Sequence, residues 1–511
     1  MTPVPALFSC GLIGGGQLTI ACGNLLLERG HRIAWVQARG AAVADWARQH
    51  NIPLCESPAD ISATGPFDFL FSIVNDLVLS EAYLTLPRLG AINYHNALLP
   101  RYAGVFATSW ALLNNEKEHG ITWHLMEPRV DAGDILIQRT VPIEPHHTAY
   151  TLNQACHAAA LAALAGLLDQ WRQGLYPRTP QDPANRTYYP LQRKPPQAGL
   201  IVWPDETASI ARLVRALLRG TIDNSFELPR FLYGNSFMIV EAIETAPVFI
   251  RSSPGTIVAI DTTGISIATG DGAVRLPQLQ YPDGRSIAAV DWARTEGLPA
   301  GYQLPVPGHA LAHRLEQACT AMARHEDDCL RAWRLAKTDW LPMPATEMND
   351  AQGPLITHPA DAATLMAAFV RLIRPWIAGD TVPILFSFPL PADLQELSPF
   401  LDPSLPLHFS FTDNETLATL QEKAGTLMQS AMRSGIHSRD LLLRRRVKRP
   451  PVHAAFQLCR EDDSISHDAL IAFQYFPHRH AWRLISHAGT TGGLSENFLQ
   501  QQTALLLAFL A

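Results

Sequence analysis

Hydrophobic and polar positions in the first part of the chain follow two periods in alternation. Short apolar, β-branched runs, which predict buried strands, alternate with stretches whose apolar positions recur at helical spacing. This alternation predicts an α/β fold with a doubly wound, mostly parallel sheet. The predicted strands are Ala6–Ile13, Arg32–Ala38, Phe67–Val74, Ala91–His95, Gly120–Met126 and Asp134–Thr140, and the predicted helices are Gln17–Gly30, Ala41–Gln49, Phe106–Asn115 and Tyr150–Gly174.

Ligands of such open sheets bind beyond the carboxyl ends of the strands. The ends of Phe67–Val74 and Ala91–His95 should therefore meet at one crevice. The Gly14-Gly15-Gly16 run does not complete the dinucleotide-binding Gly-x-Gly-x-x-Gly pattern, because Thr19 occupies the last glycine position. We interpret these glycines as a flexible turn that lets a ligand approach the backbone.

A proline-rich segment, residues 182–196, predicts a linker after a first domain that covers residues 1–180. Its Arg186, Arg193 and Lys194 are interpreted as solvated charges. A second domain, residues 199–305, has short strands with glycine turns, a pattern typical of a small β-barrel. These strands are Ser236–Ile243, Gly255–Ile260, Gly264–Thr269 and Ala273–Leu276.

Residues 308–511 predict a third, α+β region. Leu315–Trp340 and Ala362–Trp376 are expected to be amphipathic helices, and Pro451–Cys459 a strand. A further helix should be capped by Thr412, Asp413 or Asn414. The apolar final segment, Thr503–Ala511, suggests a face that needs a cover, and hence a further domain or a longer parent chain.

Composition narrows the functional class. The chain has 511 residues, 47% hydrophobic and 17% charged, with a formal net charge of −7. These values fit a globular protein and give no indication of nucleic-acid binding. The seven scattered cysteines favour a reducing cytoplasm over a disulfide framework. The longest apolar run, Ala158–Leu168, is shorter than the ~20 residues that span a bilayer, and no secretory signal is visible, so no membrane association is expected.

Candidate chemistry lies at the end of the fourth predicted strand. Asn93 and His95 are two residues apart, so they should share a face of the strand. Asp131 stands before Gly133, where the chain can turn. An amide, an imidazole and a carboxylate on neighbouring strand ends suit acyl chemistry. Taken singly, each has a structural alternative: a turn cap, a satisfied core histidine and an ordinary turn residue.

The combination of motifs is more specific. Asn93-x-His95-x-x-Leu-Leu-Pro-Arg-Tyr, followed by Asp131-x-Gly-Asp-Ile-Leu, resembles the folate-dependent formyltransferase family. This resemblance implies a Rossmann-like fold, 10-formyltetrahydrofolate as co-substrate, and Asn93, His95 and Asp131 as catalytic residues. Ala97 replaces the usual serine of the folate loop, and Ala103 stands where many members carry arginine. The implied folate-binding residues are Ser72, Ile73, Val74, Asn75, Ala97, Leu98, Leu99, Pro100 and Val130.

The rest of the chain shows two weaker resemblances. Ser253–Gln280 resembles the C-terminal domain of methionyl-tRNA formyltransferase-like proteins. The order of elements after residue 308 resembles half of a peptide-synthetase condensation domain, but the His-His-x-x-x-Asp-Gly motif is absent. His478, Arg479 and His480 are expected at a solvated turn. The basic patch Arg444–Lys448 could contact an acidic carrier protein or phosphopantetheine phosphate, or be a solvated face.

The implied reaction is formyl transfer to a primary amine, and it requires no metal. Asn93 and His95 would stabilise the oxyanion, and Asp131 would orient the imidazole and accept the amine proton. The condensation-like region favours a carrier-bound aminoacyl thioester, with a carrier protein or downstream synthetase domain as partner. The alternatives are an amino-sugar nucleotide, a free amino acid, or a non-catalytic folate-binding scaffold. Methionyl-tRNA is disfavoured by the negative net charge.

Overall fold

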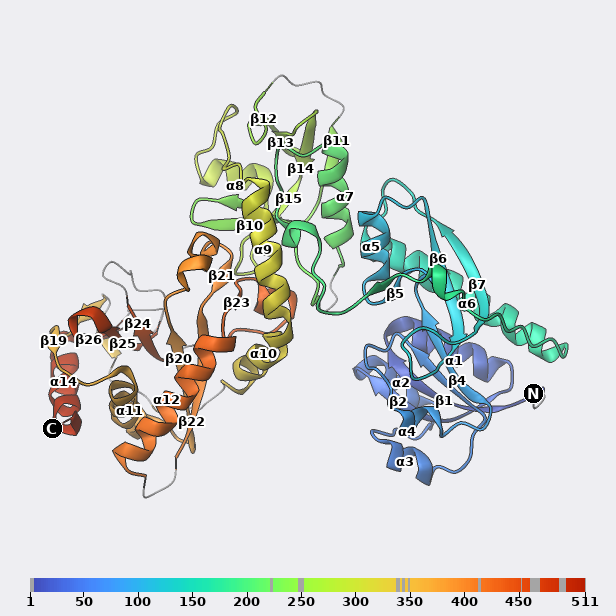
Figure 1. Cartoon of the computed structure of the whole chain (residues 1–511), viewed down its shortest axis with the longest axis horizontal. Helices are drawn as coiled ribbons and strands as arrows, with labels where there is room; N and C mark the ends of the chain where they lie inside the picture. The colour runs from blue at the N-terminus through green and yellow to red at the C-terminus, as the bar shows by residue number, and fades with distance from the viewer. Residues whose placement is uncertain are drawn as a thin grey trace.

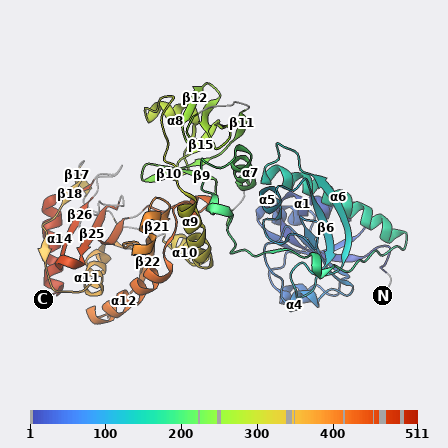
Figure 2. The same cartoon turned by 45° about the horizontal axis from the view of Figure 1, so that its top comes forward.

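The computed structural model describes residues 4–510, except 221–223, 247–251, 337–340, 342–344, 348–349, 412–414, 452, 460–468 and 487–492. Three groups of elements follow one another along the chain (Figures 1 and 2). The blue-to-cyan group contains β1 (Ser9–Gly15), α1 (Gly16–Glu28), β2 (Arg32–Arg39), α2 (Ala41–Gln49), α3 (Pro58–Ala63), β3 (Phe69–Ile73), α4 (Glu81–Leu84), β4 (Gly90–His95), β5 (Ala103–Gly104), α5 (Ala107–Leu113), β6 (Glu118–Leu125), β7 (Ile135–Pro142) and α6 (Ala149–Arg172).

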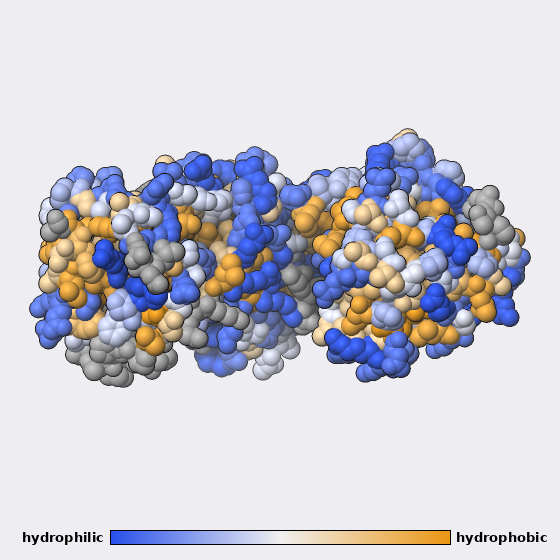
Figure 3. All heavy atoms as spheres, turned by 90° about the horizontal axis from the view of Figure 1, so that it is seen from below, coloured by the Kyte–Doolittle hydropathy of each residue, from blue (hydrophilic) through white to orange (hydrophobic). Residues whose placement is uncertain are grey.

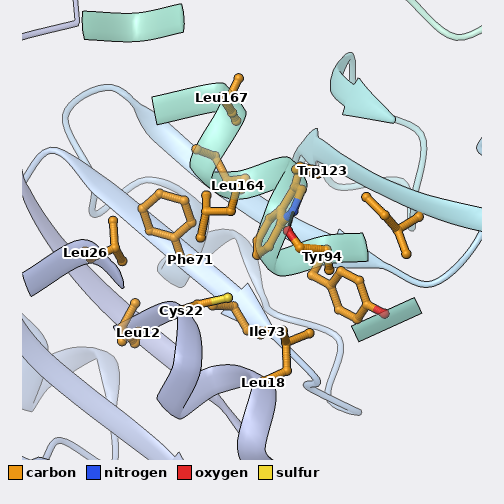
Figure 4. Packing of buried hydrophobic residues seen from close by; sticks show 14 of the residues in the cluster. Leu12, Leu18, Cys22, Leu26, Phe71, Ile73, Tyr94, Trp123, Leu164 and Leu167 are labelled. Atoms are coloured by element: carbon orange, nitrogen blue, oxygen red, sulfur yellow. Dashed lines mark hydrogen bonds between the residues drawn. The ribbon is translucent and has the colours of Figure 1, made fainter. Parts of the chain in front are cut away.

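The main sheet of this first group has the strand order β2-β1-β3-β4-β6-β7. Strands β2, β1, β3 and β4 are parallel to one another. At the other edge, β6 is antiparallel to both of its neighbours, β4 and β7. The prediction of an α/β fold with a mostly parallel sheet is confirmed. Helix α6 covers one face with leucines that meet Phe71 and Trp123 of the sheet, as Figure 4 shows for Leu164 and Leu167.

Helix α6 is also the one helix, among the described residues, long and apolar enough to cross a membrane by length and composition. Its apolar character has a simpler cause here. The side chains that recur along one side are buried in the domain core: Leu152, Cys156, Ala160, Ala163, Leu164 and Leu167. On the face seen in Figure 3, hydrophobic atoms lie in separate patches among hydrophilic ones.

The glycines of the turn after β1 also have a structural role. A Cβ on Gly14 would lie 1.8 Å from the carbonyl oxygen of Ile73, so this glycine allows close contact between neighbouring strands. Gly16 has a φ of +69°, which glycine adopts at no steric cost. Gly14 therefore serves the packing of β1 on β3, and the approach of a ligand to this turn stays a prediction.

The second group, green in Figure 1, surrounds a hydrophobic core that also contains Tyr102, Trp110 and Ala111 of the first group. Its eight strands form two antiparallel four-stranded sheets, β16-β15-β10-β9 and β11-β14-β13-β12. The predicted strands of a small barrel therefore occur in two ladders around one core. The elements are α7 (Thr207–Leu217), β9 (Arg230–Tyr233), β10 (Ser236–Val240), β11 (Glu244–Ala246), β12 (Ile257–Asp261), β13 (Gly264–Ala268), β14 (Ala273–Leu276), β15 (Gln278–Gln280), β16 (Ser286–Ala288) and α8 (Ala289–Thr295).

The third group, yellow to red in Figure 1, is an α+β unit around a seven-stranded mixed sheet. Its helices are α9 (His309–Met322), α10 (Glu326–Leu335), α11 (Ala362–Ile373), α12 (Leu417–Ser434), α13 (Leu441–Arg444) and α14 (Glu496–Leu510). Its strands are β17 (Ala345–Glu347), β18 (Ala351–Gln352), β19 (Ile356–Thr357), β20 (Thr381–Ser387), β21 (Leu401–Asp402), β22 (Ser404–Ser410), β23 (His437–Ser438), β24 (Ala454–Leu458), β25 (Ile471–Phe476), β26 (Ala481–Ser486) and β27 (Gly493–Leu494).

Several expectations for this third group need correction. The single helix expected over Leu315–Trp340 is interrupted at residues 323–325, and residues 337–340 lie outside the described part of the chain. The expected caps Thr412, Asp413 and Asn414 also lie outside it, and Thr416 caps α12 instead. Helix α14 buries Leu499 and Leu506 in the core of its own group, which provides part of the cover that we expected from elsewhere. The exposed turn at residues 477–480 is confirmed.

The second and third groups share a buried ion cluster. Three cations and three carboxylates lie within 4 Å of oppositely charged partners, with distances such as 2.7 Å for Lys194–Glu326 and 3.0 Å for Arg230–Asp440. The interpretation of Lys194 as a solvated charge is therefore wrong, because its side chain is 1% exposed. Arg444, with a side chain that is 0% exposed, is neither a solvated charge nor a carrier contact. The six members are Lys194, Glu227, Arg230, Glu326, Asp440 and Arg444.

Candidate active site

The candidate site is built on one face of three neighbouring strands. Asn93 on β4 pairs in register with Ser72 on β3 and with His124 on β6, and His95 pairs with Thr122. Directly paired residues project to the same face of a sheet, as do residues two apart on one strand. The sheet therefore presents an amide and two imidazoles side by side.

Asp131 reaches this face from the loop between β6 and β7. Its Oδ2 accepts a hydrogen bond of 2.8 Å from the amide of Gly104 and lies 3.6 Å from Nδ1 of His95. Its Oδ1 lies 3.6 Å from Nε2 of His124. Burial raises the pKa of the Asp131 carboxyl, but His95, His124 and the Gly104 amide together hold this pKa well below its usual range. Asp131 is therefore a buried carboxylate between two imidazoles.

The hydrogen bond at the other ring nitrogen of His95 fixes its role. Nε2 lies 2.8 Å from the carbonyl oxygen of Tyr102. A carbonyl oxygen only accepts, so Nε2 carries a hydrogen. Any proton that this imidazole gains or releases is therefore held at Nδ1, the atom that faces Asp131.

His124 orients the amide of Asn93. Its Nδ1 lies 2.7 Å from the carbonyl oxygen of Leu125, which only accepts, so Nδ1 carries a hydrogen. Its Nε2 can then accept from Nδ2 of Asn93, 3.2 Å away. This bond uses one N–H of the Asn93 amide and leaves the other available to a ligand.

The loop after β4 crosses this face and is held by β6 and β7. The amide of Leu99 donates to Oγ1 of Thr122 at 3.1 Å, and that hydroxyl donates to the carbonyl of Ala97 at 2.6 Å. Gln138 adds a donor to the carbonyl of Leu99 at 2.8 Å. Three hydrogen bonds thus fix the backbone of the segment that sequence reasoning assigned to the folate.

The predicted folate-binding residues are not equally placed to contact a ligand with their side chains. Val74 is 40% exposed, and Asn75, Leu98, Pro100 and Val130 are at least partly accessible. Ser72 lies beside Asn93 and accepts from Asn75 at 3.3 Å. The remaining three side chains are buried in hydrophobic cores or packed loops, so only their backbone could serve a ligand: Ile73, Ala97 and Leu99.

Sequence reasoning missed His124 and misread the segment that follows α6. His124 stands two residues after Thr122 on a predicted strand, so strand periodicity would have found it once the pairing with β4 was known. Arg186, interpreted as a solvated linker charge, instead donates to the carbonyl oxygens of Val130 and Asp131 at 2.7 and 3.1 Å. No short-range pattern indicates this contact.

Among the solved structures that the chain resembles is HypX from Aquifex aeolicus in complex with tetrahydrofolic acid. It is 16% identical, with a TM-score of 0.43, and the match covers 57% of this chain and 47% of that one, so the chain spans less than half of the HypX chain. WlaRD, a sugar 3N-formyl transferase solved in the presence of dTDP and 5-N-formyl-THF, is 18% identical, with a TM-score of 0.43. That match covers 53% of this chain and 98% of that chain.

Sequence relatives are closer. Methionyl-tRNA formyltransferase of Citrifermentans bemidjiense is 30% identical over 321 residues, which cover 58% of this chain and 95% of the relative. The corresponding enzyme of Geobacter metallireducens is 30% identical over 280 residues, 52% of this chain and 83% of the relative. The formyl transferase family model matches residues 71–168, and the model of the formyl transferase C-terminal domain matches residues 194–297. The chain belongs to the formyl transferase family.

Proposed function

We propose that this formyltransferase transfers the formyl group of 10-formyltetrahydrofolate to a primary amine at Asn93, His95 and Asp131. The observation that carries the proposal is the placement of Asp131, whose two carboxylate oxygens each lie 3.6 Å from an imidazole beside the Asn93 amide. In this view residues 1–180 form the catalytic domain, and residues 199–305 and 308–511 form two accessory domains.

The side chains fit the chemistry of acyl transfer to nitrogen. The co-substrate supplies an activated formyl group, and a neutral amine must attack its carbon. The free N–H of Asn93 can donate to the oxygen that becomes negative, an interaction worth about 3–4 kcal/mol in comparable sites. Asp131 and Nδ1 of His95 together can accept the proton that the amine loses.

The folate fits between the exposed Val74 and the loop that contains Leu98. Val74 stands at the carboxyl end of β3, where open sheets bind their ligands. Leu98 packs across Gly120, where a Cβ would lie 2.6 Å from its side chain. The backbone of the intervening loop is held by Thr122 and Gln138, so this wall of the site is formed before a ligand arrives.

For the acceptor we propose the amino group of an aminoacyl thioester bound to a carrier protein. Support comes from the resemblance of residues 308–511 to part of a condensation domain and from the exposed Arg446 and Lys448, which could face an acidic carrier. The cytoplasm is the proposed location, since no disulfide joins the seven cysteines, which are all buried. An amino-sugar nucleotide or a free amino acid is the second candidate acceptor, and a non-catalytic folate-binding scaffold is the third possibility.

Mass spectrometry of candidate amines tests both levels of this proposal. Purified protein and 10-formyltetrahydrofolate would be incubated with aminoacyl carrier proteins, amino-sugar nucleotides, free amino acids and methionyl-tRNA, and each product inspected for one added formyl group. Formylation of the carrier-bound amine alone supports the full proposal. Formylation of a different amine would support the formyltransferase activity but contradict the proposed acceptor. If no amine is formylated, the remaining possibility is a non-catalytic folate-binding scaffold.

A further inference from the structure

The backbone of the loop that carries Asp131 is held by side chains from a distant segment, residues 181–186. Nε2 of Gln181 donates to the carbonyl oxygens of Asp131 and Gly133 at 3.0 and 2.7 Å. The guanidinium of Arg186 donates to Val130 and Asp131 at 2.7 and 3.1 Å. The carbonyl oxygens of Val130, Asp131 and Gly133 thus accept hydrogen bonds from these two side chains, and the oxygen of Asp131 accepts two. Both side chains lie outside the main sheet.

This support has a local reason. Asp131 has a φ of +51°, a left-handed conformation that is uncommon for residues other than glycine. Such a conformation persists where the surroundings determine it. The direction of the Asp131 side chain depends on the backbone conformation of the same residue. Its position next to His95 and His124 therefore depends on the conformation that Gln181 and Arg186 stabilise.

The next residues along the chain, 187–189, contact the backbone of Tyr102 and Gly104, the residues that bond to His95 and Asp131. Oγ1 of Thr187 accepts from the amide of Tyr102 at 2.7 Å, and Tyr188–Tyr189 (β8) pairs in parallel with β5. Tyr102 is the residue whose carbonyl holds His95, and Gly104 on β5 donates to Asp131. A Cβ on Gly104 would lie 2.2 Å from the carbonyl oxygen of Tyr189, so the two strands are in close contact.

Arg186 is itself placed for this task. Asp182 accepts from the amide of Ala184 at 3.0 Å and from Asn185 at 2.8 Å, and this turn precedes Arg186 directly. The guanidinium lies 5.6 Å from the ring of Tyr188. Among the described residues, neither an ion pair nor a carboxylate contact is found for Arg186, so its two loop carbonyls are its polar protein partners.

We propose that Arg186, assisted by Gln181, is a positioning residue for formyl transfer: it holds the backbone at Val130–Asp131 so that Asp131 faces His95 and His124. The proposal rests on the proposed function, because it assigns Asp131 a role in that reaction. Arg186 acts through Asp131 and contacts neither the formyl donor nor the amine.

Arg186→Ala should lower kcat by about tenfold to a hundredfold, the effect of a small misplacement of a catalytic group. The dissociation constant of 10-formyltetrahydrofolate should change much less. Arg186→Lys should fall between wild type and Arg186→Ala, since one ammonium cannot reproduce the paired donors of a guanidinium. Guanidinium ion added at millimolar concentration should restore part of the activity of Arg186→Ala. Arg178→Ala, which removes an exposed ion pair with Asp134 in the same region, is the matched control.

Amide hydrogen exchange provides a readout that does not need the acceptor. Peptides covering residues 102–106 and 128–134 should exchange faster in Arg186→Ala than in wild type or Arg178→Ala. Unchanged exchange and unchanged kcat in Arg186→Ala would overturn the proposal. If the wild-type protein formylates none of the tested amines, the proposed function fails, while the exchange result still decides whether Arg186 holds the loop.

Discussion

Nε2 of His124 lies 3.6 Å from Oδ1 of Asp131, whereas His95 faces the other carboxylate oxygen, Oδ2. The carboxylate is therefore held between two imidazoles, and its pKa is depressed although it is buried. A carboxylate that stays ionised in such a site can orient a neighbouring imidazole, whose Nδ1 can accept the proton of the substrate amine.

The first prediction concerns His95 and Asp131, the residues proposed to be catalytic. His95→Ala and Asp131→Asn should each lower kcat by about 10²–10⁴-fold, because each removes a group that moves or directs a proton. Circular dichroism should show a folded protein in both cases. Steady-state kinetics with the accepted amine provides the measurement, and near-wild-type turnover in both variants would refute the assignment.

His124 should matter for a different reason. His124→Ala removes the acceptor for the Asn93 amide and one of the two imidazoles beside Asp131. We expect kcat to fall by about 10²-fold, because the Asn93 amide would no longer be oriented to donate to the oxyanion. His124→Gln, which retains an acceptor, should recover part of this loss. Equal activity of wild type and His124→Ala would show that Asn93 is oriented by other contacts.

Stability should depend on pH through His119. Burial lowers the pKa of His119 to about 4, and its Nε2 lies 2.6 Å from the carbonyl oxygen of Asn96. Below a pH of about 6.5, the pKa of histidine in the unfolded chain, His119 binds a proton in the unfolded chain but not in the folded protein. The free energy of unfolding therefore decreases as the pH is lowered. By pH 4 this group should cost about 3 kcal/mol of unfolding free energy. The measurement is urea denaturation between pH 7 and pH 4.

His119→Gln is the variant that isolates this contribution, since glutamine can still donate to Asn96 and does not titrate in this range. The stability of wild type relative to this variant should decrease as pH falls from 6.5 to 4. Parallel stability curves for the two proteins would mean that His119 does not carry the effect.

The buried ion cluster predicts a large loss of stability when one partner is removed. Glu227→Gln leaves Lys194 and Arg230 with fewer counter-charges in a buried site, which typically costs about 3–5 kcal/mol. Asp291→Asn is the control, because its pair with Arg294 is exposed and worth less than about 1 kcal/mol. Chemical denaturation that follows the transition of the second and third groups provides the comparison. A similar small effect in both variants would contradict the prediction.

Docking of a carrier protein should involve the part of the basic patch that remains exposed. Arg446 and Lys448 are exposed, whereas Arg444 is buried in the ion cluster. Reversing both exposed charges to glutamate should raise KM for carrier-bound substrate by about tenfold, since rim charges steer association. KM for a free aminoacyl-pantetheine mimic should stay unchanged. A matched reversal of Arg285 and Arg294 on the second group should affect neither substrate; equal effects of the two double variants would exclude the patch.

The sequence alone determined the alternation of strands and helices and the shared face of Asn93 and His95. Both follow from local periodicity, because side-chain direction along a strand repeats every two residues whatever lies beside it. The motif around Asp131 also placed a carboxylate after the next strands. What the sequence could not show was how closely that carboxylate would approach the histidines, since this depends on the turn at Asp131 and its φ of +51°.

The tertiary structure decided the environment of two charges in the segment after α6. Arg186 and Lys194 stand in a proline-rich, polar stretch, which local pattern reads as a solvated linker. Packing instead brings Arg186 to the Asp131 loop and Lys194 to Glu227 and Glu326. Burial of a charge is favourable only when partners from distant segments satisfy it, and those partners meet it only once the chain has folded.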